Sequence, residues 1–200
     1  MVSKLQVISG RFRGKKLCIP PCSRPTQQKA RGAVFNMLAE IVGDGAGWLV
    51  WDAFAGSGAM GIEFISRFGA TKAIFTDPDA DAIECIRKNT DGIDGCEVIR
   101  VGADNIRPSV FTKMHAEPTA GGYYPPLRMV VFIDPPYDRP ELGGKLMARL
   151  SNDAPTGTIV VWEVEKPSAP PPFSRIPNGW RVLKDKTYGR ARFLILEKAE

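Results

Sequence analysis

The segment Asp134-Pro135-Pro136-Tyr137 combines residue types that could grip a planar amino group. It directly follows the apolar run 129–133 (MVVFI), which is typical of a buried strand. The two prolines fix φ and remove N–H donors, so the loop is stiff. The Asp134 carboxylate and the Pro135 carbonyl can both accept hydrogen bonds from one NH₂ group, while Tyr137 stacks on its base. We predict that these four residues are catalytic and act by positioning an amine; a proline-rich turn is the alternative.

A glycine-rich segment, Asp52 to Gly61 (DAFAGSGAMG), lies between an apolar run and a helical pattern. Its G-x-G-x-x-G spacing lets a ligand approach the backbone at Gly56 and Gly58, where side chains would collide. The glycines alone would suit a nicotinamide dinucleotide, but Asp52 would repel the pyrophosphate of that ligand and attract a cation. S-adenosylmethionine carries a sulfonium and an ammonium group, so this segment favours it as the cofactor.

Two further acids are expected around the same ligand. Asp77 ends the next predicted strand, where its carboxylate can accept hydrogen bonds from both ribose hydroxyls. Asp104 follows the third strand and could contact the adenine amine. Either acid alone is as easily explained by a turn or a helix cap. Together with Asp52, Phe54 and the glycine loop, they form our predicted cofactor-binding site.

The elements that must position these residues alternate along the chain. Apolar runs predict strands, and residues with helical spacing between them predict helices, so we expect a mostly parallel sheet covered on both faces. Near the end of the chain, two apolar runs flank KTYG with no room for a crossover helix, which predicts an antiparallel hairpin. The expected strands are 48–52, 72–77, 96–101, 129–134, 158–164, 180–184 and 192–197, and the expected helices are 28–41, 59–68 and 79–90.

The chain has 200 residues, 44% apolar and 24% charged, which is typical of a globular domain and excludes fibrous and membrane-spanning classes. Residues 1–31 contain eight basic side chains and no acid, so the remainder holds 19 basic and 22 acidic residues. This asymmetry predicts a polyanionic partner, nucleic acid before a membrane surface, and a solvated basic edge is the alternative. The residues predicted to contact phosphates, and so to bind RNA if the partner is RNA, are Arg11, Arg13, Lys15, Arg24 and Arg31.

We divide the chain into a basic N-terminal extension, 1–27, and a main domain, 28–200. In the extension, residues 5–19 predict two short strands around a turn at 10–14. The four cysteines, Cys18, Cys22, Cys85 and Cys96, fit no common zinc spacing, and His115 is the only histidine, so we expect no metal. With no secretory signal in the sequence, we expect reduced thiols and a cytoplasmic location.

Several segments resemble a known family. DAFAGSGAMGIE, Asp77 and VFIDPPYD are similar to class I S-adenosylmethionine-dependent amino-methyltransferases, and ISGRFRGKKL, SRPTQQKARGAVFNML and KTYGRARFLILE resemble the bacterial 16S ribosomal RNA guanine-N2 methyltransferases (small-subunit methyltransferase D). The resemblance implies a seven-stranded Rossmann-like sheet, an N-terminal extension that helps to hold RNA, and one guanine of the small-subunit RNA as substrate. We expect a monomer without membrane or metal partners.

The chain departs from the family pattern at Gln28, Lys29 and Gly32, and Asp77 stands where the family commonly has glutamate. Other interpretations are a DNA adenine-N6 methyltransferase, since the same tetrapeptide serves both amines, and a non-catalytic RNA-binding assembly factor. A protein glutamine methyltransferase would be expected to have asparagine at position 134, where this chain has aspartate. A nicotinamide oxidoreductase would leave Asp134-Pro135-Pro136-Tyr137 unexplained. Glu163 and the insert 115–126 receive no role from the sequence.

Overall fold

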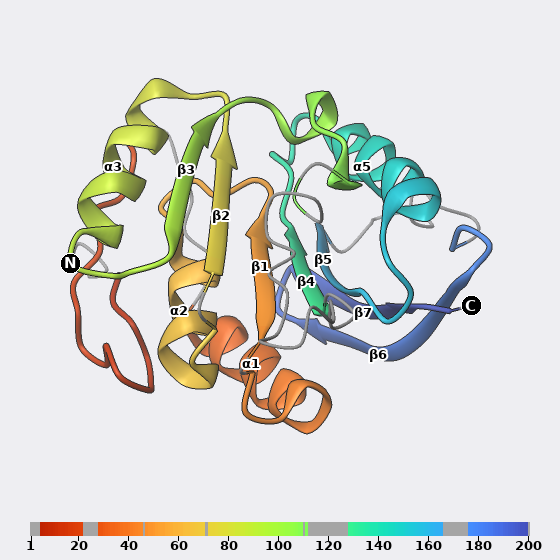
Figure 1. Cartoon of the computed structure of the whole chain (residues 1–200), viewed down its shortest axis with the longest axis horizontal. Helices are drawn as coiled ribbons and strands as arrows, with labels where there is room; N and C mark the ends of the chain where they lie inside the picture. Colours follow the sequence, from red (N-terminus) through yellow and green to blue (C-terminus); the bar gives the residue numbers. More distant parts are fainter. Residues whose placement is uncertain are drawn as a thin grey trace, which may run out of the picture.

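The strands expected from residue 48 onward form one seven-stranded sheet (Figure 1). This computed structural model describes residues 5–21, 28–45, 47–70, 72–109, 111, 128–165 and 176–199. All seven predicted strands are confirmed with small shifts at their ends, except that β6 continues well beyond its predicted end. The strands are β1 (Trp48–Asp52), β2 (Lys72–Asp77), β3 (Cys96–Arg100), β4 (Arg128–Ile133), β5 (Ile159–Glu165), β6 (Trp180–Tyr188) and β7 (Ala191–Lys198).

The order of the strands in the sheet is β3-β2-β1-β4-β5-β7-β6. β1 pairs in parallel with both β2 and β4, and β3 and β5 extend the parallel part on either side. β7 lies antiparallel between β5 and β6, so the predicted α/β class with an antiparallel C-terminal hairpin is confirmed. The chain runs from β1 outward through β2 to β3 and then crosses to the other side of β1 to form β4, so the strand order reverses between β1 and β4. In such sheets, ligands bind in the crevice at the carboxyl ends of the two strands that border this reversal.

Helices cover both faces of the sheet. Alternate strand residues face opposite layers, so Val50 packs with side chains of α1, α2 and α3, whereas Trp51 packs with those of α5. None of the described helices is long and apolar enough to cross a membrane. The helical elements are α1 (Gln28–Val42), α2 (Ala59–Phe68), α3 (Ala80–Thr90), the 3-10 turn η1 (Ala103–Asn105) and α5 (Glu141–Asp153).

Helix α5 is not among the elements predicted from the sequence. Its buried face is formed by Leu146, Met147 and Leu150, which do have helical spacing. The first turns contain Gly143 and Gly144, and glycine is a poor helix former, so local propensity obscures the pattern. Packing of this face against the sheet stabilises the helix despite the glycines.

The N-terminal segment folds against the main domain and does not form two regular strands. Its backbone pairs across the turn at one isolated antiparallel bridge, between Gln6 and Lys16. Leu5, Val7 and Leu17 are buried in the same apolar cluster as the central strands. The predicted hairpin is therefore present, but the two predicted strands are wrong, because residues 8–12 use their backbone donors on α2 rather than on each other.

A fully buried carboxylate, Glu63 in α2, holds this segment in place. The backbone N–H groups of Ile8 and Ser9 donate to its two oxygens at 2.7 and 3.0 Å. Arg67, one turn later, donates from Nε at 2.6 Å. Arg31 of α1 places its Nε 3.8 Å from Glu63 and also donates to the carbonyl of Gln6. Glu63 thus links the N-terminal segment, α1 and α2.

Ser66, on the same face of α2, provides a second anchor. The backbone N–H of Arg11 donates to the Ser66 carbonyl at 2.8 Å, and that of Phe12 donates to its hydroxyl at 2.9 Å. The Ser66 hydroxyl in turn donates to the carbonyl of Ser9. Gly10 has a φ of 83°, and a Cβ there would lie 1.9 Å from the Ser66 carbonyl oxygen, so only glycine allows this close approach.

The fold also brings two cysteines together. Asn89 of α3 accepts a hydrogen bond from the N–H of Cys18 at 2.7 Å and donates to its carbonyl at 2.9 Å. This contact places Cys18 beside Cys85, one helical turn before Asn89, and the two form a disulfide. The expectation of reduced thiols is therefore wrong for this pair. Cys96 is free, and burial, with the charge of Asp94, raises the pKa of its thiol to about 11. Cys22 lies outside the described residues.

We predict that Glu63→Ala lowers the free energy of unfolding by about 3–5 kcal/mol, because it leaves the buried Arg31 without its counter-charge. Urea denaturation followed by circular dichroism would measure this loss. Glu63→Gln, which keeps an acceptor but not the charge, should have a smaller effect.

A matched control is Glu84→Ala on α3, which also removes a glutamate from an i,i+4 ion pair. The pair between Glu84 and Lys88 is largely exposed, so the midpoint of unfolding should hardly change. Equal effects of the two alanine substitutions would show that Glu63 does not organise the N-terminal segment.

Candidate active site

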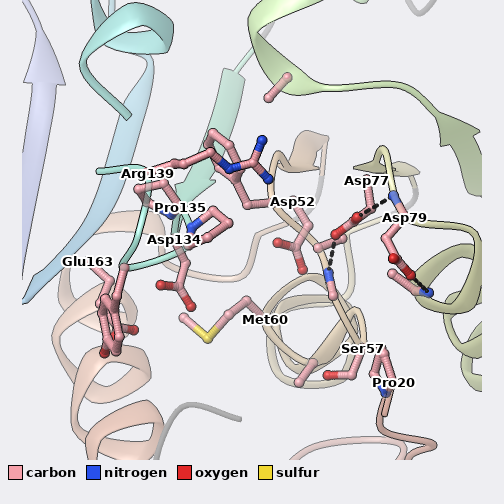
Figure 2. A pocket seen from close by; sticks show the side chains of 18 of the residues that line it. Pro20, Asp52, Ser57, Met60, Asp77, Asp79, Asp134, Pro135, Arg139 and Glu163 are labelled. Carbon is pink, nitrogen blue, oxygen red and sulfur yellow. Dashed lines mark hydrogen bonds between the residues drawn. The ribbon is translucent and has the colours of Figure 1, made fainter. Parts of the chain in front are cut away.

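All of the residues predicted to be catalytic or to bind the cofactor, except Gly58, line one cavity of about 730 Å³. Its walls include Asp52, Asp77, Asp134 and Glu163, which come from the carboxyl ends of β1, β2, β4 and β5 (Figure 2). A volume of this size is within the range that holds a small-molecule ligand. The cavity therefore lies where parallel sheets of this kind bind ligands, at the reversal of strand order.

Asp52 is a buried carboxylate at the end of β1, with 3% of its surface exposed. Burial raises its pKa to about 7, the hydrogen bond from the Gly61 N–H opposes this shift, and the nearby charge of Asp77 adds to it. The Gly61 N–H donates to Asp52 Oδ2 at 2.9 Å. In the described part of the chain, no basic side chain forms an ion pair with Asp52. A cationic ligand would supply the missing opposite charge.

The third glycine of the loop, Gly61, allows this contact. A Cβ at Gly61 would lie 2.4 Å from the ring of Phe75 on β2 and 3.3 Å from the Cβ of Asp52. Glycine therefore lets the first turn of α2 pack directly on the sheet and brings its N–H to Asp52. Gly58 does not line the cavity, in contrast to the role predicted for it. It precedes α2 with a φ of 75° and turns the chain into the helix.

Asp77, at the end of β2, shapes the same loop. Its Oδ2 accepts from the Gly56 N–H and its Oδ1 from the Asp79 N–H, both at 2.9 Å. Burial raises the pKa of Asp77, and these two hydrogen bonds oppose the shift. Because a carboxylate has about four acceptor sites, Asp77 can hold the loop and still accept from a ligand. Phe54, Gly56 and Asp104, which we assign to the cofactor from the sequence, also line the cavity.

Asp134, Pro135, Pro136 and Tyr137 form the wall opposite the glycine loop. In Figure 2, Asp134 and Asp52 lie on opposite sides of the view, and the side chain of Asp134 points down toward Met60. The Tyr137 hydroxyl donates to Glu163 Oε1 at 3.2 Å. Burial and the charges of Glu163 and Asp134 raise the pKa of the Tyr137 phenol, so it remains protonated and can donate. The tetrapeptide therefore lines the same cavity as Asp52 and Asp77.

Some lining residues were not assigned a role from the sequence. Glu163 is buried at the end of β5, and its type and place after an apolar strand were the available signals. Arg190 comes from the turn between β6 and β7, and Pro20 and Pro21 come from the N-terminal segment. The cavity wall therefore combines residues from segments that are far apart in the chain. In the described residues, no group of three or more His, Cys, Asp or Glu side chains could hold a metal ion.

The predicted RNA contacts separate in the structure. Arg11 and Arg13 are exposed, whereas the Lys15 ammonium donates to the carbonyl of Asp91 at 2.9 Å. Arg24 lies outside the described residues. Arg31 is 1% exposed and faces Glu63, so we correct its assignment: it is an internal counter-ion and not a surface contact for phosphates.

The N-terminal segment and the glycine loop are connected through Asn89 of α3. Asn89, which holds the backbone of Cys18, also donates to the carbonyl of Ser57 in the loop at 2.8 Å. One buried amide therefore fixes both segments relative to α3. This contact keeps Pro20 and Pro21, which follow Cys18, at the wall of the cavity.

Comparisons with known proteins identify one family model and similar proteins that include methyltransferases. The family model described as Conserved hypothetical protein 95 matches residues 5–197. Ribosomal RNA small subunit methyltransferase D of Escherichia coli is 27% identical over 198 residues, covering 98% of this chain and 90% of that protein. A hypothetical protein from Thermus thermophilus has a similar fold, with a TM-score of 0.70, 23% identity, and coverage of 96% of this chain and 99% of the other. An rRNA methylase from Streptococcus thermophilus has a TM-score of 0.55, 13% identity, and coverage of 89% and 100%.

The raised pKa of Asp52 predicts how stability depends on pH. The unfolded chain releases the Asp52 proton near pH 3.8 and the folded protein near pH 7, so the folded state loses stability between these values. Asp52→Asn keeps an acceptor for the Gly61 N–H and removes the titration. We expect this variant to be more stable than the wild type by up to about 4 kcal/mol above pH 7.5.

Urea denaturation of both proteins from pH 4 to 8.5 tests this prediction, because all other titrating groups are common to the pair. The stability difference should grow as the pH rises from 4 to 7 and stay constant above that. A difference that does not change with pH would contradict the assignment of a raised pKa to Asp52.

Proposed function

This chain belongs to the Conserved hypothetical protein 95 family, and we propose that it methylates the exocyclic N2 amine of a guanine in 16S ribosomal RNA, with S-adenosylmethionine as the methyl donor. One observation carries the proposal: a buried acid without a basic partner in the described residues and the tetrapeptide Asp134-Pro135-Pro136-Tyr137 face each other across one cavity. The first suits a cationic cofactor and the second suits a planar amine.

The cofactor half of the cavity has the chemistry that S-adenosylmethionine requires. S-adenosylmethionine supplies an electrophilic methyl group and leaves as a neutral thioether. Asp52 would provide a negative charge for its positively charged methionyl end, and Asp77 would accept from the ribose hydroxyls. Phe54 and Asp104 would enclose the adenine, and Gly56 leaves room for the ligand beside the loop. A pyrophosphate would face Asp52 and Asp77 together, which argues against a nicotinamide cofactor.

The substrate half would position the amine. Asp134 and the Pro135 carbonyl would accept the two hydrogens of one NH₂ group, which turns the nitrogen lone pair out of conjugation and toward the methyl group. The Asp134 carboxylate would also stabilise the positive charge that develops on the nitrogen. The methylated nitrogen then loses one proton without the need for a strong base. Tyr137, whose hydroxyl is held by Glu163, would stack on the base.

Two observations support ribosomal RNA as the substrate. The Escherichia coli relative that matches nearly the whole chain is named a ribosomal RNA small subunit methyltransferase. Arg11 and Arg13 are exposed and flank Phe12, and the backbone N–H groups of Arg11 and Phe12 donate to Ser66 of α2, so the fold supports both arginines from below. Such a support suits contacts with phosphates, which give affinity and orientation without reading sequence.

The principal alternative is methylation of adenine N6 in DNA, because the same tetrapeptide serves both amines. The relative that matches nearly the whole chain is named for ribosomal RNA, which favours RNA. A non-catalytic assembly factor would use the basic segment but would not need a buried acid beside the tetrapeptide. We therefore keep the enzyme as the proposed function.

The experiment is methyl transfer from tritiated S-adenosylmethionine to small ribosomal subunits that lack the modification, followed by nucleoside analysis. We expect N2-methylguanosine from the wild type. Asp134→Ala should retain cofactor affinity and lower the single-turnover rate about 10² to 10³-fold, the loss typical of one hydrogen-bonding group aimed at developing charge. Asp94→Ala, which removes an exposed acid from the turn before β3, is the matched control and should react normally.

The outcomes separate substrate from mechanism. Formation of N6-methyladenosine would overturn the guanine assignment. A wild-type rate in Asp134→Ala would overturn the role of the tetrapeptide.

A second prediction concerns the N-terminal segment. Substitution of both Arg11 and Arg13 by glutamine should weaken RNA binding and reduce the slope of log K against log salt by about 1 to 2, because fewer counterions are released. Cofactor affinity should be unchanged. The control is the pair Lys145→Gln and Arg181→Gln, which removes the same charge from α5 and β6. If both pairs change the slope equally, the segment acts only through net charge.

A further inference from the structure

We propose that Glu163 determines the choice of base: its carboxylate accepts the N1–H of the target guanine while Asp134 holds the N2 amine. This inference rests on the proposed function and assigns a role to a residue that the tetrapeptide does not contain. It makes the substrate half of the cavity a two-carboxylate site that fits guanine and rejects adenine.

The register of the sheet places the two acids side by side. β4 and β5 pair in parallel with Ile133 opposite Trp162, so Asp134 and Glu163 are the next residues along each strand. Both line the cavity, and in Figure 2 their side chains lie at the same end of it, opposite Asp52 and Asp77. Two acceptors at neighbouring positions can meet two neighbouring donors on one flat ligand.

Tyr137 ties the two acids into one unit. Its hydroxyl donates to Glu163 Oε1 at 3.2 Å, and the charges of Glu163 and Asp134 both contribute to the raised pKa of the phenol. That hydrogen bond uses one of about four acceptor sites on the carboxylate and restricts its orientation. Because Glu163 is only 6% exposed, the acceptor sites on its carboxylate are held in a site largely shielded from water.

The edges of the two purines differ where this pair would meet them. Guanine presents two adjacent donors, N1–H and the N2 amine. Adenine presents one amine beside N1, which is an acceptor. With the adenine amine on Asp134, the N1 lone pair would face the Glu163 carboxylate, so two acceptors would be left without a proton between them. A site built to accept from a substrate N–H strongly rejects an analogue that lacks it.

A purely structural role for Glu163 predicts a different result. If Glu163 only oriented Tyr137, then removing the Tyr137 hydroxyl would reproduce the effect of changing Glu163. If Glu163 contacts the base, the two changes should differ in selectivity. Glu163→Gln keeps an oxygen that can accept from Tyr137 and adds an NH₂ group that can donate to an unprotonated ring nitrogen.

The test compares guanine with 2-aminopurine at the mapped target position of 16S rRNA, introduced by ligation and assembled into subunits. 2-Aminopurine keeps the 2-amine but has an acceptor at N1. Wild-type kcat/KM should favour guanine by about 10² or more. Glu163→Gln should lower the guanine value about 10-fold to 100-fold and reduce the preference below about 10-fold. Tyr137→Phe should keep the wild-type preference, and S-adenosylmethionine affinity should be normal in both variants.

Each result bears on a defined claim. If the wild type forms no N2-methylguanosine, the proposed function fails, whatever Glu163 does. If the wild type methylates guanine but uses 2-aminopurine equally well, the inference about Glu163 is overturned, and this result does not depend on the folding of any variant. An unchanged preference in Glu163→Gln, or an equal loss of preference in Tyr137→Phe, would also overturn it.

Discussion

The buried carboxylate of Glu63 is the constraint on which the position of the N-terminal segment depends. A charge that is fully removed from water must be paired and hydrogen-bonded, or the fold loses several kcal/mol. Two backbone N–H groups, Arg67 and the nearby Arg31 meet this requirement. The same contacts determine the path of residues 5–21. That path leaves the side chains of Arg11 and Arg13 exposed and places Pro20 at the wall of the cavity.

The cavity itself follows from the topology of the sheet. Parallel strands end at a common edge, and the strand order reverses between β1 and β4, so Asp52 and Asp134 come from adjacent strands on either side of the reversal. The glycine loop fills one side and the proline-rich loop the other. Burial of Asp52 costs stability, as its raised pKa indicates, and a cationic ligand would offset that cost. Natural proteins often accept such a local cost at a functional site.

The N-terminal segment combines two physical roles in a short stretch. Its apolar side chains Leu5, Val7 and Leu17 extend the core, and its backbone N–H groups donate hydrogen bonds to side chains of α2 such as Glu63. Its exposed arginines, Arg11 and Arg13, therefore project from a segment that packs and hydrogen-bonds against the main domain. Asn89 then connects the segment to the glycine loop through Cys18 and Ser57. The N-terminal segment and the glycine loop are thus parts of one hydrogen-bonded structure.

By itself, the sequence determined the α/β class, seven strands, the glycine loop with Asp52 and Asp77, and the tetrapeptide at Asp134. Each of these is a local pattern, in which residue type and spacing within one segment decide the outcome. The tertiary structure alone decided that Arg31 is internal, that Glu63 is the anchor, that Cys18 pairs with Cys85, and that Tyr137 binds Glu163. It also decided that α5 forms although its first turns contain two glycines, and that Gly58 turns the chain into α2. These outcomes depend on contacts between segments that are distant in the chain. Such contacts determine which side chains are buried and which partners they meet, and the sequence of one segment does not specify them.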